Sequence, residues 1–292
     1  MLKGSIVAIV TPFKNGNIDE TSLRNLINWH IDEGTHGIVP VGTTGESPTL
    51  DHKEHRDVVE IVIDQVNNRV PVIAGAGSNS TSEAISLLKH AEGAGADAAL
   101  VVTPYYNKPT QEGIYQHYQM ISKVCPLPII LYNVPGRTAS NITAETTLRL
   151  ANNFNNIIAV KEASGDMDQI MKIIKNKPTN FIVISGDDGL TLPMIYMGAE
   201  GVISVIGQSH PKEYSAMVAE GRYGNISKAN KLHYGLYDYY GPLYSEGNPA
   251  GVKACLELLG ICKAVVRPPL VEVSPIIKTQ LKVEIFLKVF FF

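Results

Sequence analysis

The sequence predicts an α/β fold, an eight-stranded (β/α)8 TIM barrel with a helical appendage at its carboxyl end. Eight short apolar segments alternate with longer amphipathic segments within the first 210 residues. Strands that alternate with helices are joined by right-handed crossovers into a parallel sheet, and eight such units fit a closed barrel better than an open sheet. An open dinucleotide-binding sheet would also show a glycine fingerprint after its first strand, where this chain has TPFKNGN (11–17).

The eight apolar segments are the expected strands. Each is short, contains β-branched residues and is bounded by glycine, proline or polar residues, as buried parallel strands are. They cover residues 5–10, 37–41, 70–74, 98–102, 128–132, 157–161, 181–185 and 201–205.

The amphipathic segments between these strands are the expected helices. In the first of them, 19–34, Leu23, Leu26 and Ile31 recur at the spacing that places apolar side chains on one helix face. The others cover residues 51–67, 80–95, 110–124, 143–151, 166–176 and 189–197.

The strand pattern stops after residue 210, and three further segments (212–221, 227–240 and 250–259) have the character of helices. We therefore expect a barrel over residues 1–210 and a helical region over residues 211–292 that packs on it. The chain ends in VEIFLKVFFF (283–292), which is apolar on every side. Such a segment must pack on its own barrel or on a neighbouring molecule to avoid aggregation.

Size and charge restrict the class of partner. The chain has 292 residues, of which 45% are hydrophobic and 18% charged, enough for a large core. A net charge of -3 and a pI near 6.2 offer no basic field for nucleic acid or an anionic membrane. We expect small molecules and further copies of the chain as partners.

Cysteine content and apolar runs indicate the compartment. Three cysteines without metal-ligand spacing suit a reducing compartment, and we expect the cytoplasm. No apolar run is long enough to span a membrane. The opening MLKGSIVAIVTPF (1–13) has the character of a first strand rather than of a signal peptide, because its apolar run is short and no cleavage site follows.

Lys161 is the unusual residue of the sixth strand, within IIAVKEASG (157–165). A strand that is covered on both faces leaves little room for a hydrated ammonium, so this group is paired, exposed at the strand end or held partly neutral. A neutral amine can attack a carbonyl carbon and form a Schiff base. For this stretch alone, a lysine in a surface ion pair is the more common situation.

Polar residues at other strand ends favour the chemical role, because the carboxyl ends of barrel strands carry the chemistry. After the second strand, GTTGES (42–47) offers two hydroxyls and flexible amides that can grip a small carboxylate, although a tight turn that caps the next helix fits as well. The fifth strand ends in Tyr132, whose phenol can relay protons. Arg137 follows it and can bind a carboxylate unless it is a surface residue. A carboxylate anchor beside an amine is what Schiff-base chemistry on a 2-oxo acid requires.

The sequence predicts no metal site and no cofactor. His52 and His55 lie three residues apart on an expected helix, but no cysteine or carboxylate completes a ligand set, so we expect solvated histidines. The glycines of AGAGSNST (74–81) lack the lysine of a phosphate-binding loop. Nothing favours a pyridoxal or nicotinamide site.

Five motifs together resemble those of the pyruvate-dependent class I aldolase superfamily. They are GTTGES (42–47), TPYYNKP (103–109), YNVPGRT (132–138), VKEASG (160–165) and SGDD (185–188). The resemblance covers nearly the whole chain, from SIVAIVTPF to PPLVEVS. It is strongest to the branch that condenses pyruvate with L-aspartate 4-semialdehyde on the diaminopimelate route to lysine. The resemblance implies a lyase that forms a Schiff base and needs no cofactor.

The resemblance also implies catalytic roles. Lys161 matches the lysine that forms the imine with pyruvate. Tyr132 matches the tyrosine that shuttles protons, and Thr44 and Tyr106 complete a hydroxyl relay. In the family, the residue at Tyr106 reaches in from the neighbouring subunit, so we expect a homo-oligomer, a homotetramer built as a dimer of dimers.

Substrate-binding positions follow from the same resemblance. Thr43 and Thr44 match the pair that holds the pyruvate carboxylate, helped by the backbone at Ile203. Arg137 matches the arginine that receives the carboxylate of L-aspartate 4-semialdehyde, and Gly186 lies where substrate contacts the backbone. Relatives that act like N-acetylneuraminate lyase generally lack this arginine, so such an aldolase is the alternative. A binding protein on an inactive barrel would have a broken site.

A regulatory site for L-lysine at a dimer interface is a further implication. The matching positions are Ser47, His52, His55, Asn79, Glu83 and Tyr105. Glu83 can pair with an amino group of the effector. Pro48 departs from the small residue that is usual in the sensitive relatives.

Overall fold

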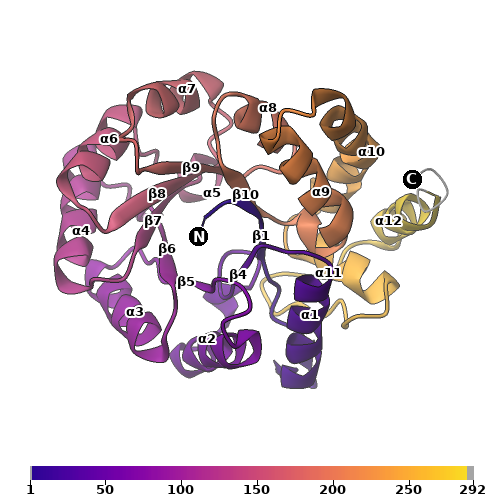
Figure 1. Cartoon of the computed structure of the whole chain (residues 1–292). Helices are drawn as coiled ribbons and strands as arrows, with labels where there is room; N and C mark the ends of the chain where they lie inside the picture. Colours follow the sequence, from indigo (N-terminus) through magenta and orange to yellow (C-terminus); the bar gives the residue numbers. More distant parts are fainter. Residues whose placement is uncertain (1, 288–292) are drawn as a thin grey trace.

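The computed structural model describes residues 2–287 and forms a parallel barrel (Figure 1). Its strands are β1 (Gly4–Ala8), β4 (Gly37–Val39), β5 (Ile73–Gly75), β6 (Ala98–Val102), β7 (Ile129–Asn133), β8 (Ile157–Glu162), β9 (Ile182–Ser185) and β10 (Gly201–Ser204). They pair in the order β4-β1-β10-β9-β8-β7-β6-β5. A parallel bridge between Ile38 of β4 and Val72, just before β5, joins the two ends of this order and closes the ring.

A helix follows each barrel strand and covers the outside of the sheet (Figure 1). These helices are α1 (Glu20–Asp32), α2 (His52–Val66), α3 (Thr81–Ala94), α4 (Gln111–Val124), α6 (Ala144–Asn153), α7 (Met167–Asn176), α8 (Thr191–Tyr196) and α9 (Pro211–Arg222). The carboxyl-terminal region adds α10 (Ile226–Ser245), α11 (Ala250–Leu258) and α12 (Pro275–Leu287) at one side of the barrel. The predicted fold class is confirmed.

Side-chain caps begin many of these helices at the predicted places. Asp19, Thr143 and Asp166 each accept a hydrogen bond from a backbone N–H of the first turn. Asp51 and Glu54 form a capping box at the start of α2. Each cap satisfies an N–H group that would otherwise lack a partner, which is why polar residues before an apolar pattern predict a helix start.

Some short elements at the carboxyl ends of strands were not predicted. They are the hairpin of β2 (Phe13–Lys14) and β3 (Asn17–Ile18), the helix α5 (Pro135–Thr138) and the 3-10 turns η1 (Ser47–Thr49) and η2 (Ile206–Gln208). Elements of two to four residues are too short to show a hydrophobic period. Helix α10 also runs past residue 240, its predicted end, because Leu243 is buried in the core and holds the last turn in place.

Strand side chains alternate between the barrel interior and the layer under the helices. On β7, Ile130 faces the interior cluster, whereas Leu131 packs in the outer cluster beneath the helices. On β8, Ala159 faces inward and Val160 outward. Because successive side chains of a strand point to opposite faces, the residue two positions beyond Ala159 faces inward again. That residue is Lys161.

The end of the chain packs on its own fold as far as the structure describes it. Helix α12 lies against α10 and α11, and its Leu281 and Ile285 are buried. Within the apolar tail (283–292), Ile285 is buried and Val283 is 45% exposed, and the final FLKVFFF (286–292) lies outside the side chains described. Within residues 2–287, no helix has both the length and the apolar character to cross a membrane.

Acid is expected to destabilise the fold through buried histidines. Burial lowers the pKa of His30 to about 3 and the pKa values of His55 and His117 to about 4. Below about pH 6.5 the unfolded chain binds protons that the folded chain refuses, so the free energy of unfolding falls by about 1.4 kcal/mol per pH unit for each histidine. The stabilisation that these neutral histidines provide is fully present above that pH, and it is lost as the pH falls toward their pKa values in the folded chain.

Urea unfolding at a series of pH values measures this slope. The variant His30→Leu removes the histidine whose two ring nitrogens have no hydrogen-bond partner in the described chain. Its slope is expected to be shallower than that of the parent by about 1.4 kcal/mol per pH unit. Above pH 7 the two proteins should differ by an amount that does not depend on pH. Equal slopes in acid would contradict the expectation.

Candidate active site

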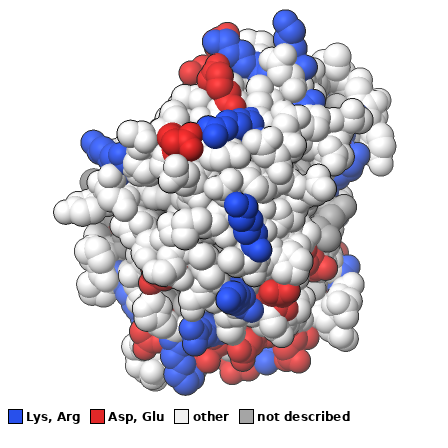
Figure 2. Space-filling model, turned by 90° about the vertical axis from the view of Figure 1, so that its left-hand side faces the viewer, with Lys and Arg blue, Asp and Glu red and all other residues white. Residues whose placement is uncertain are grey.

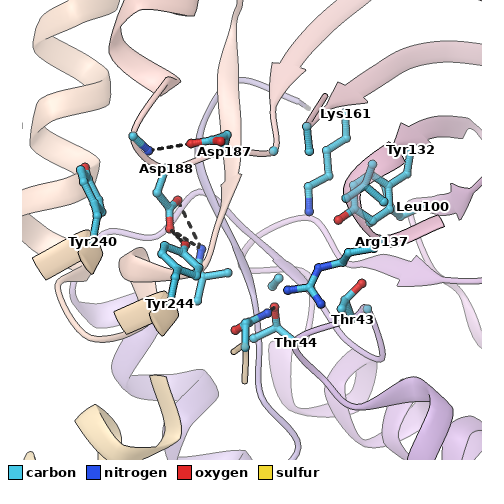
Figure 3. Close-up of a pocket in the computed structure, with 18 residues that line it drawn as sticks. Thr43, Thr44, Leu100, Tyr132, Arg137, Lys161, Asp187, Asp188, Tyr240 and Tyr244 are labelled. Atoms are coloured by element: carbon cyan, nitrogen blue, oxygen red, sulfur yellow. Dashed lines mark hydrogen bonds between the residues drawn. The ribbon is translucent and has the colours of Figure 1, made fainter. Parts of the chain in front are cut away.

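A cavity of about 290 Å³ opens at the carboxyl ends of the barrel strands (Figure 3). Six of the residues predicted for catalysis or substrate binding line it, namely Thr43, Thr44, Tyr132, Arg137, Lys161 and Gly186. They come from the ends of β4, β7, β8 and β9, or from the loops that follow these strands. The barrel therefore gathers residues that lie as far apart in sequence as 43 and 186.

Lys161 lies inside the cavity against Tyr132. The two residues are paired neighbours on β8 and β7, and the Nζ atom of Lys161 is 4.2 Å from the centre of the Tyr132 ring. Only 6% of Lys161 is exposed, and no carboxylate lies within ion-pair distance of it in the described chain. A surface ion pair is thereby excluded. The amine is buried, unpaired and directed at the space where a ligand would sit (Figure 3).

Gly186 makes room for this lysine. A Cβ atom at position 186 would lie 2.9 Å from Cε of Lys161 and 2.8 Å from Cβ of Ala163. Such contacts are shorter than van der Waals distances, so any side chain here would displace the lysine. Glycine at the end of β9 is thus required by the lysine on β8.

Thr43 and Thr44 lie on a tight turn that follows β4. Val41 and Glu46 adopt positive φ values of 48° and 58°, which are costly for residues with a Cβ atom. The turn also packs closely, since a Cβ at Gly45 would lie 2.9 Å from the backbone nitrogen of Val41. The hydroxyl of Thr44 is buried and accepts a hydrogen bond from Asn248 Nδ2 at 2.9 Å. The turn thus holds a hydroxyl in a defined place at the cavity wall.

Arg137 extends from α5 into the cavity, toward Thr44 (Figure 3). No carboxylate lies within ion-pair distance of its guanidinium in the part of the chain that the structure describes. The arginine is therefore free to bind an anionic group of a ligand bidentately. Lys161 and Arg137 give this side of the cavity two basic groups.

Acidic and phenolic groups form the opposite wall (Figure 3). The carboxylate of Asp188 accepts hydrogen bonds from the Tyr244 hydroxyl and from the backbone N–H of Ile206, the latter at 2.8 Å. Asp187 accepts one from the backbone N–H of Gly189 at 3.0 Å, and burial raises the pKa of its carboxyl. Burial, with the nearby Asp188 charge, also raises the pKa of Tyr244. The cavity therefore has one basic and one acidic side.

Several lining residues were missed by the sequence prediction. Asn248, Tyr240 and Tyr244 come from α10 and the loop after it, more than 50 residues from the last strand-end motif. The spacing of four between Tyr240 and Tyr244 on one helix was a usable signal, because such residues share a face. Asn248 offered none.

Two predicted residues do not line this cavity. Ile203 is buried among the apolar side chains inside the barrel. Tyr106 is 88% exposed and has a φ of 71°, on the loop between β6 and α4. In the single chain, its ring is therefore on the surface rather than in the site.

Four of the six residues predicted for lysine regulation line two further cavities. Ser47 and Tyr105 line a cavity of about 250 Å³ that also touches Thr43 and Arg137. His52 and Glu83 line another of about 400 Å³, where His52 Nε2 and Glu83 Oε1 are 3.6 Å apart. The remaining members are placed differently.

Asn79 and His55 complete the predicted regulatory set. The Asn79 carbonyl accepts a hydrogen bond from Asn107 Nδ2 at 3.0 Å. His55 is buried on the core side of α2. The expectation that both helix histidines are solvated is therefore wrong for His55 and correct for His52, because His52 is the first residue of α2 and its side chain is 76% exposed, whereas His55 lies one turn further on among the buried residues of the helix. In residues 2–287, no three His, Cys, Asp or Glu side chains are grouped so that they could hold a metal ion.

Comparison with known proteins gives one consistent family. The sequence model of the Dihydrodipicolinate synthetase family matches residues 1–287. The 4-hydroxy-tetrahydrodipicolinate synthase of Syntrophus aciditrophicus is 52% identical over 282 residues, which are 97% of this chain and 97% of that protein.

Solved structures agree with this comparison. The chloride-inhibited dihydrodipicolinate synthase of Acinetobacter baumannii, complexed with pyruvate, matches with a TM-score of 0.94 and 44% identity over 97% of this chain and 98% of that one. The enzyme of Cyanidioschyzon merolae with lysine bound matches with a TM-score of 0.95 and 39% identity over 98% of each chain. Likeness of this extent covers the barrel and the carboxyl-terminal helices together.

Proposed function

The chain belongs to the Dihydrodipicolinate synthetase family, and we propose that it is a lyase with 4-hydroxy-tetrahydrodipicolinate synthase activity. In this reaction, pyruvate condenses with L-aspartate 4-semialdehyde on the route to diaminopimelate and lysine. The observation that carries the proposal is the buried, unpaired Lys161 amine beside Tyr132. Membership of the family indicates the reaction, and the cavity contains side chains that can carry it out.

The first step is formation of an imine. The Lys161 amine attacks the C2 carbonyl of pyruvate, the hydroxyls of Thr43 and Thr44 hold the pyruvate carboxylate, and one water leaves. Proton transfers to and from the carbinolamine oxygen pass through Tyr132 and Thr44. The low exposure of Lys161 and Tyr132 supports this role, because few water molecules can compete for the protons.

The second step forms the new carbon–carbon bond. The imine withdraws electrons, so a proton leaves the pyruvate methyl group and an enamine forms. The enamine carbon then attacks the aldehyde carbon of the second substrate, whose oxygen takes up a proton and becomes the hydroxyl. The amino group of that substrate attacks the imine carbon, closes the ring and displaces the Lys161 amine. One water is lost overall, and the enzyme is regenerated.

Arg137 is proposed to bind the carboxylate of the second substrate. Its guanidinium lines the cavity and has no carboxylate partner among the described residues. We expect Arg137→Ala to raise KM for L-aspartate 4-semialdehyde by about 10²-fold, because a charge-assisted bidentate contact contributes about 3 kcal/mol. KM for pyruvate should change little, and the ratio of the two KM values is the measurement. Equal effects on both substrates would contradict this assignment.

This arginine also separates the proposal from its alternative. A sugar-acid aldolase similar to N-acetylneuraminate lyase acts on hydroxyl-rich substrates, for which an unpaired guanidinium serves no purpose. Similarity to known proteins does not favour that alternative, since the 52% identical relative from Syntrophus aciditrophicus is a 4-hydroxy-tetrahydrodipicolinate synthase. Which aldehyde the enzyme consumes in the presence of pyruvate distinguishes the two.

The chain is proposed to work as a homo-oligomer, a dimer of dimers, in which Tyr106 completes the relay of a neighbouring copy. Its large exposure in the single chain supports this, and Met120 and Val124 of α4 are also exposed. Figure 2 shows the side of the barrel that carries α4, with few charged side chains across its middle and most of them at its ends. Such a face suits contact with another copy. Sedimentation analysis tests the mass in solution.

Feedback inhibition by L-lysine is a further part of the proposal. Glu83 beside His52 offers an acidic group for an amino group, and the related enzyme of Cyanidioschyzon merolae was solved with lysine bound. A titration of the initial rate with L-lysine tests it, and a flat response to millimolar effector would remove it.

The chain is also proposed to be cytoplasmic. Its three cysteines are free thiols, which agrees with a reducing compartment.

A turnover assay with pyruvate and L-aspartate 4-semialdehyde tests the main proposal. Intact mass after borohydride reduction in the presence of pyruvate alone should show one covalent pyruvate adduct per chain. A binding protein on an inactive barrel would give neither product nor adduct. Absence of both from the folded protein would sink the proposal.

A further inference from the structure

Asn248 is bonded to the relay hydroxyl from a distant part of the chain. It lies in the loop between α10 and α11, lines the active-site cavity, and donates from Nδ2 to Thr44 Oγ1 at 2.9 Å across 204 residues of sequence. Its Oδ1 atom is buried and has no hydrogen-bond partner in the described chain. The contact with Thr44 is therefore the one hydrogen bond of this side-chain amide among residues 2–287.

A threonine hydroxyl has one hydrogen to donate and two lone pairs that accept. Asn248 occupies one lone pair of Thr44. In the described chain, no group accepts the Thr44 hydrogen. One donor and one acceptor site therefore remain free, which is what a hydroxyl needs to receive a proton on one side and pass one on at the other.

We propose that Asn248 is a positioning residue that sets the direction of hydrogen bonding at Thr44. Because Asn248 donates to Thr44, the Thr44 hydroxyl does not donate its own hydrogen to this side chain. That hydrogen remains available to the reacting atoms. The inference rests on the proposed function, in which Thr44 belongs to the proton relay. It assigns the carboxyl-terminal region a part in catalysis.

The loop that carries Asn248 is held in place independently of this bond. Lys253 of α11 forms a fully buried ion pair with Glu46, two residues beyond Thr44, at 2.5 Å. Helix α11 also packs tightly on the end of α10, since a Cβ at Gly251 would lie 2.0 Å from the carbonyl oxygen of Leu243. Changing the Asn248 side chain should therefore alter the hydrogen bond without releasing the loop.

The direction of this bond can be reversed by Asn248→Asp, which keeps the shape but replaces the donor by a carboxylate. The carboxylate can only accept, so Thr44 must donate to it and loses its free hydrogen. At about pH 8 we expect the rate of imine formation at saturating pyruvate to fall about tenfold in Asn248→Ala and about 10²-fold in Asn248→Asp. The deficit of Asn248→Asp relative to the parent should shrink as the pH falls toward about 5, because the protonated carboxyl can donate.

A side chain that merely fills space predicts the opposite order. Asn248→Asp would then be milder than Asn248→Ala, and its deficit would not depend on pH. Borohydride quenching at timed intervals measures the rate, and either of those results overturns the inference. Glu246→Gln is the matched control, because Glu246 is an exposed residue just before the same loop and its carboxylate accepts a hydrogen bond from the backbone N–H of Ser274, away from the cavity lining. We expect it to behave like the parent.

A double-mutant cycle gives an independent test that does not need the Asp variant to fold. Thr44→Val removes the hydroxyl, so adding Asn248→Ala should cost no further activity if Asn248 acts through Thr44. Losses that multiply would overturn the inference. A parent protein that forms no pyruvate adduct would instead contradict the proposed function, which keeps the two failures apart.

Discussion

Replacing Lys161 by alanine is expected to lower turnover on the order of 10⁴- to 10⁶-fold while the fold stays intact. The amine is the nucleophile of the proposed reaction, it is buried in the cavity, and no other lysine lines that cavity in the described chain. Without it, the covalent path through the imine is closed, and only binding by the remaining groups is left. The measurements are turnover and the mass of the pyruvate adduct after borohydride reduction.

The control for this change is a lysine that is exposed and equally easy to remove. Lys172 of α7 forms an exposed ion pair with Asp168 at 2.7 Å, so Lys172→Ala should keep nearly full activity and still form the adduct. Circular dichroism of both variants should match the parent. A pyruvate adduct of normal yield on Lys161→Ala would show that another amine reacts, and the assignment of the nucleophile would have to be abandoned.

The change Glu46→Gln is expected to lower the free energy of unfolding by about 3–5 kcal/mol. Glu46 and Lys253 form an ion pair in which both side chains are 0% exposed. The neutral variant leaves the Lys253 ammonium buried without a counter-charge, and burial already lowers the pKa of this lysine. Glu46 also accepts from the backbone N–H of Arg267, so the change weakens the attachment of the carboxyl-terminal region to the turn that carries Thr44.

Urea unfolding followed by circular dichroism measures this loss. Lys278 and Glu257 provide the control, since they form an ion pair of the same 2.5 Å length that is partly exposed. Lys278→Met should change the unfolding free energy by less than about 1 kcal/mol. The double variant Glu46→Gln/Lys253→Met should be more stable than Glu46→Gln alone, because it leaves no unpaired charge. If Glu46→Gln lowers the free energy of unfolding by no more than Lys278→Met does, burial does not determine the strength of the Glu46–Lys253 pair.

Much of the site could be predicted because strand geometry is periodic. Once the eight strands are recognised, a residue at the carboxyl end of a strand belongs to the catalytic face, and alternation decides whether it points inward. Lys161 and Tyr132 satisfy both conditions on adjacent strands. The resemblance of the five motifs then gave these residues their expected roles, which periodicity alone does not supply.

The opposite wall of the cavity could not be predicted in this way. Tyr240 and Tyr244 lie on helix α10, for which the sequence predicted only a helix over 227–240, a range that ends before Tyr244. Whether these tyrosines reach the mouth of the barrel or its side depends on the orientation of α10 relative to α9. No local sequence pattern predicts that orientation. The burial of His55 could not be predicted from the sequence either, because His52, three residues earlier on the same helix, is exposed.

The sequence by itself determines the closed barrel, the position of the lysine at the end of its sixth strand and the membership of a family, because these depend on residues close together in the chain or on short motifs. The tertiary structure alone decides which groups of the carboxyl-terminal region reach the site. The contact of Asn248 with Thr44 and that of Lys253 with Glu46 each span more than 200 residues. Contacts at such separations are set by the packing of whole helices on the barrel, and they leave no periodic trace in the chain.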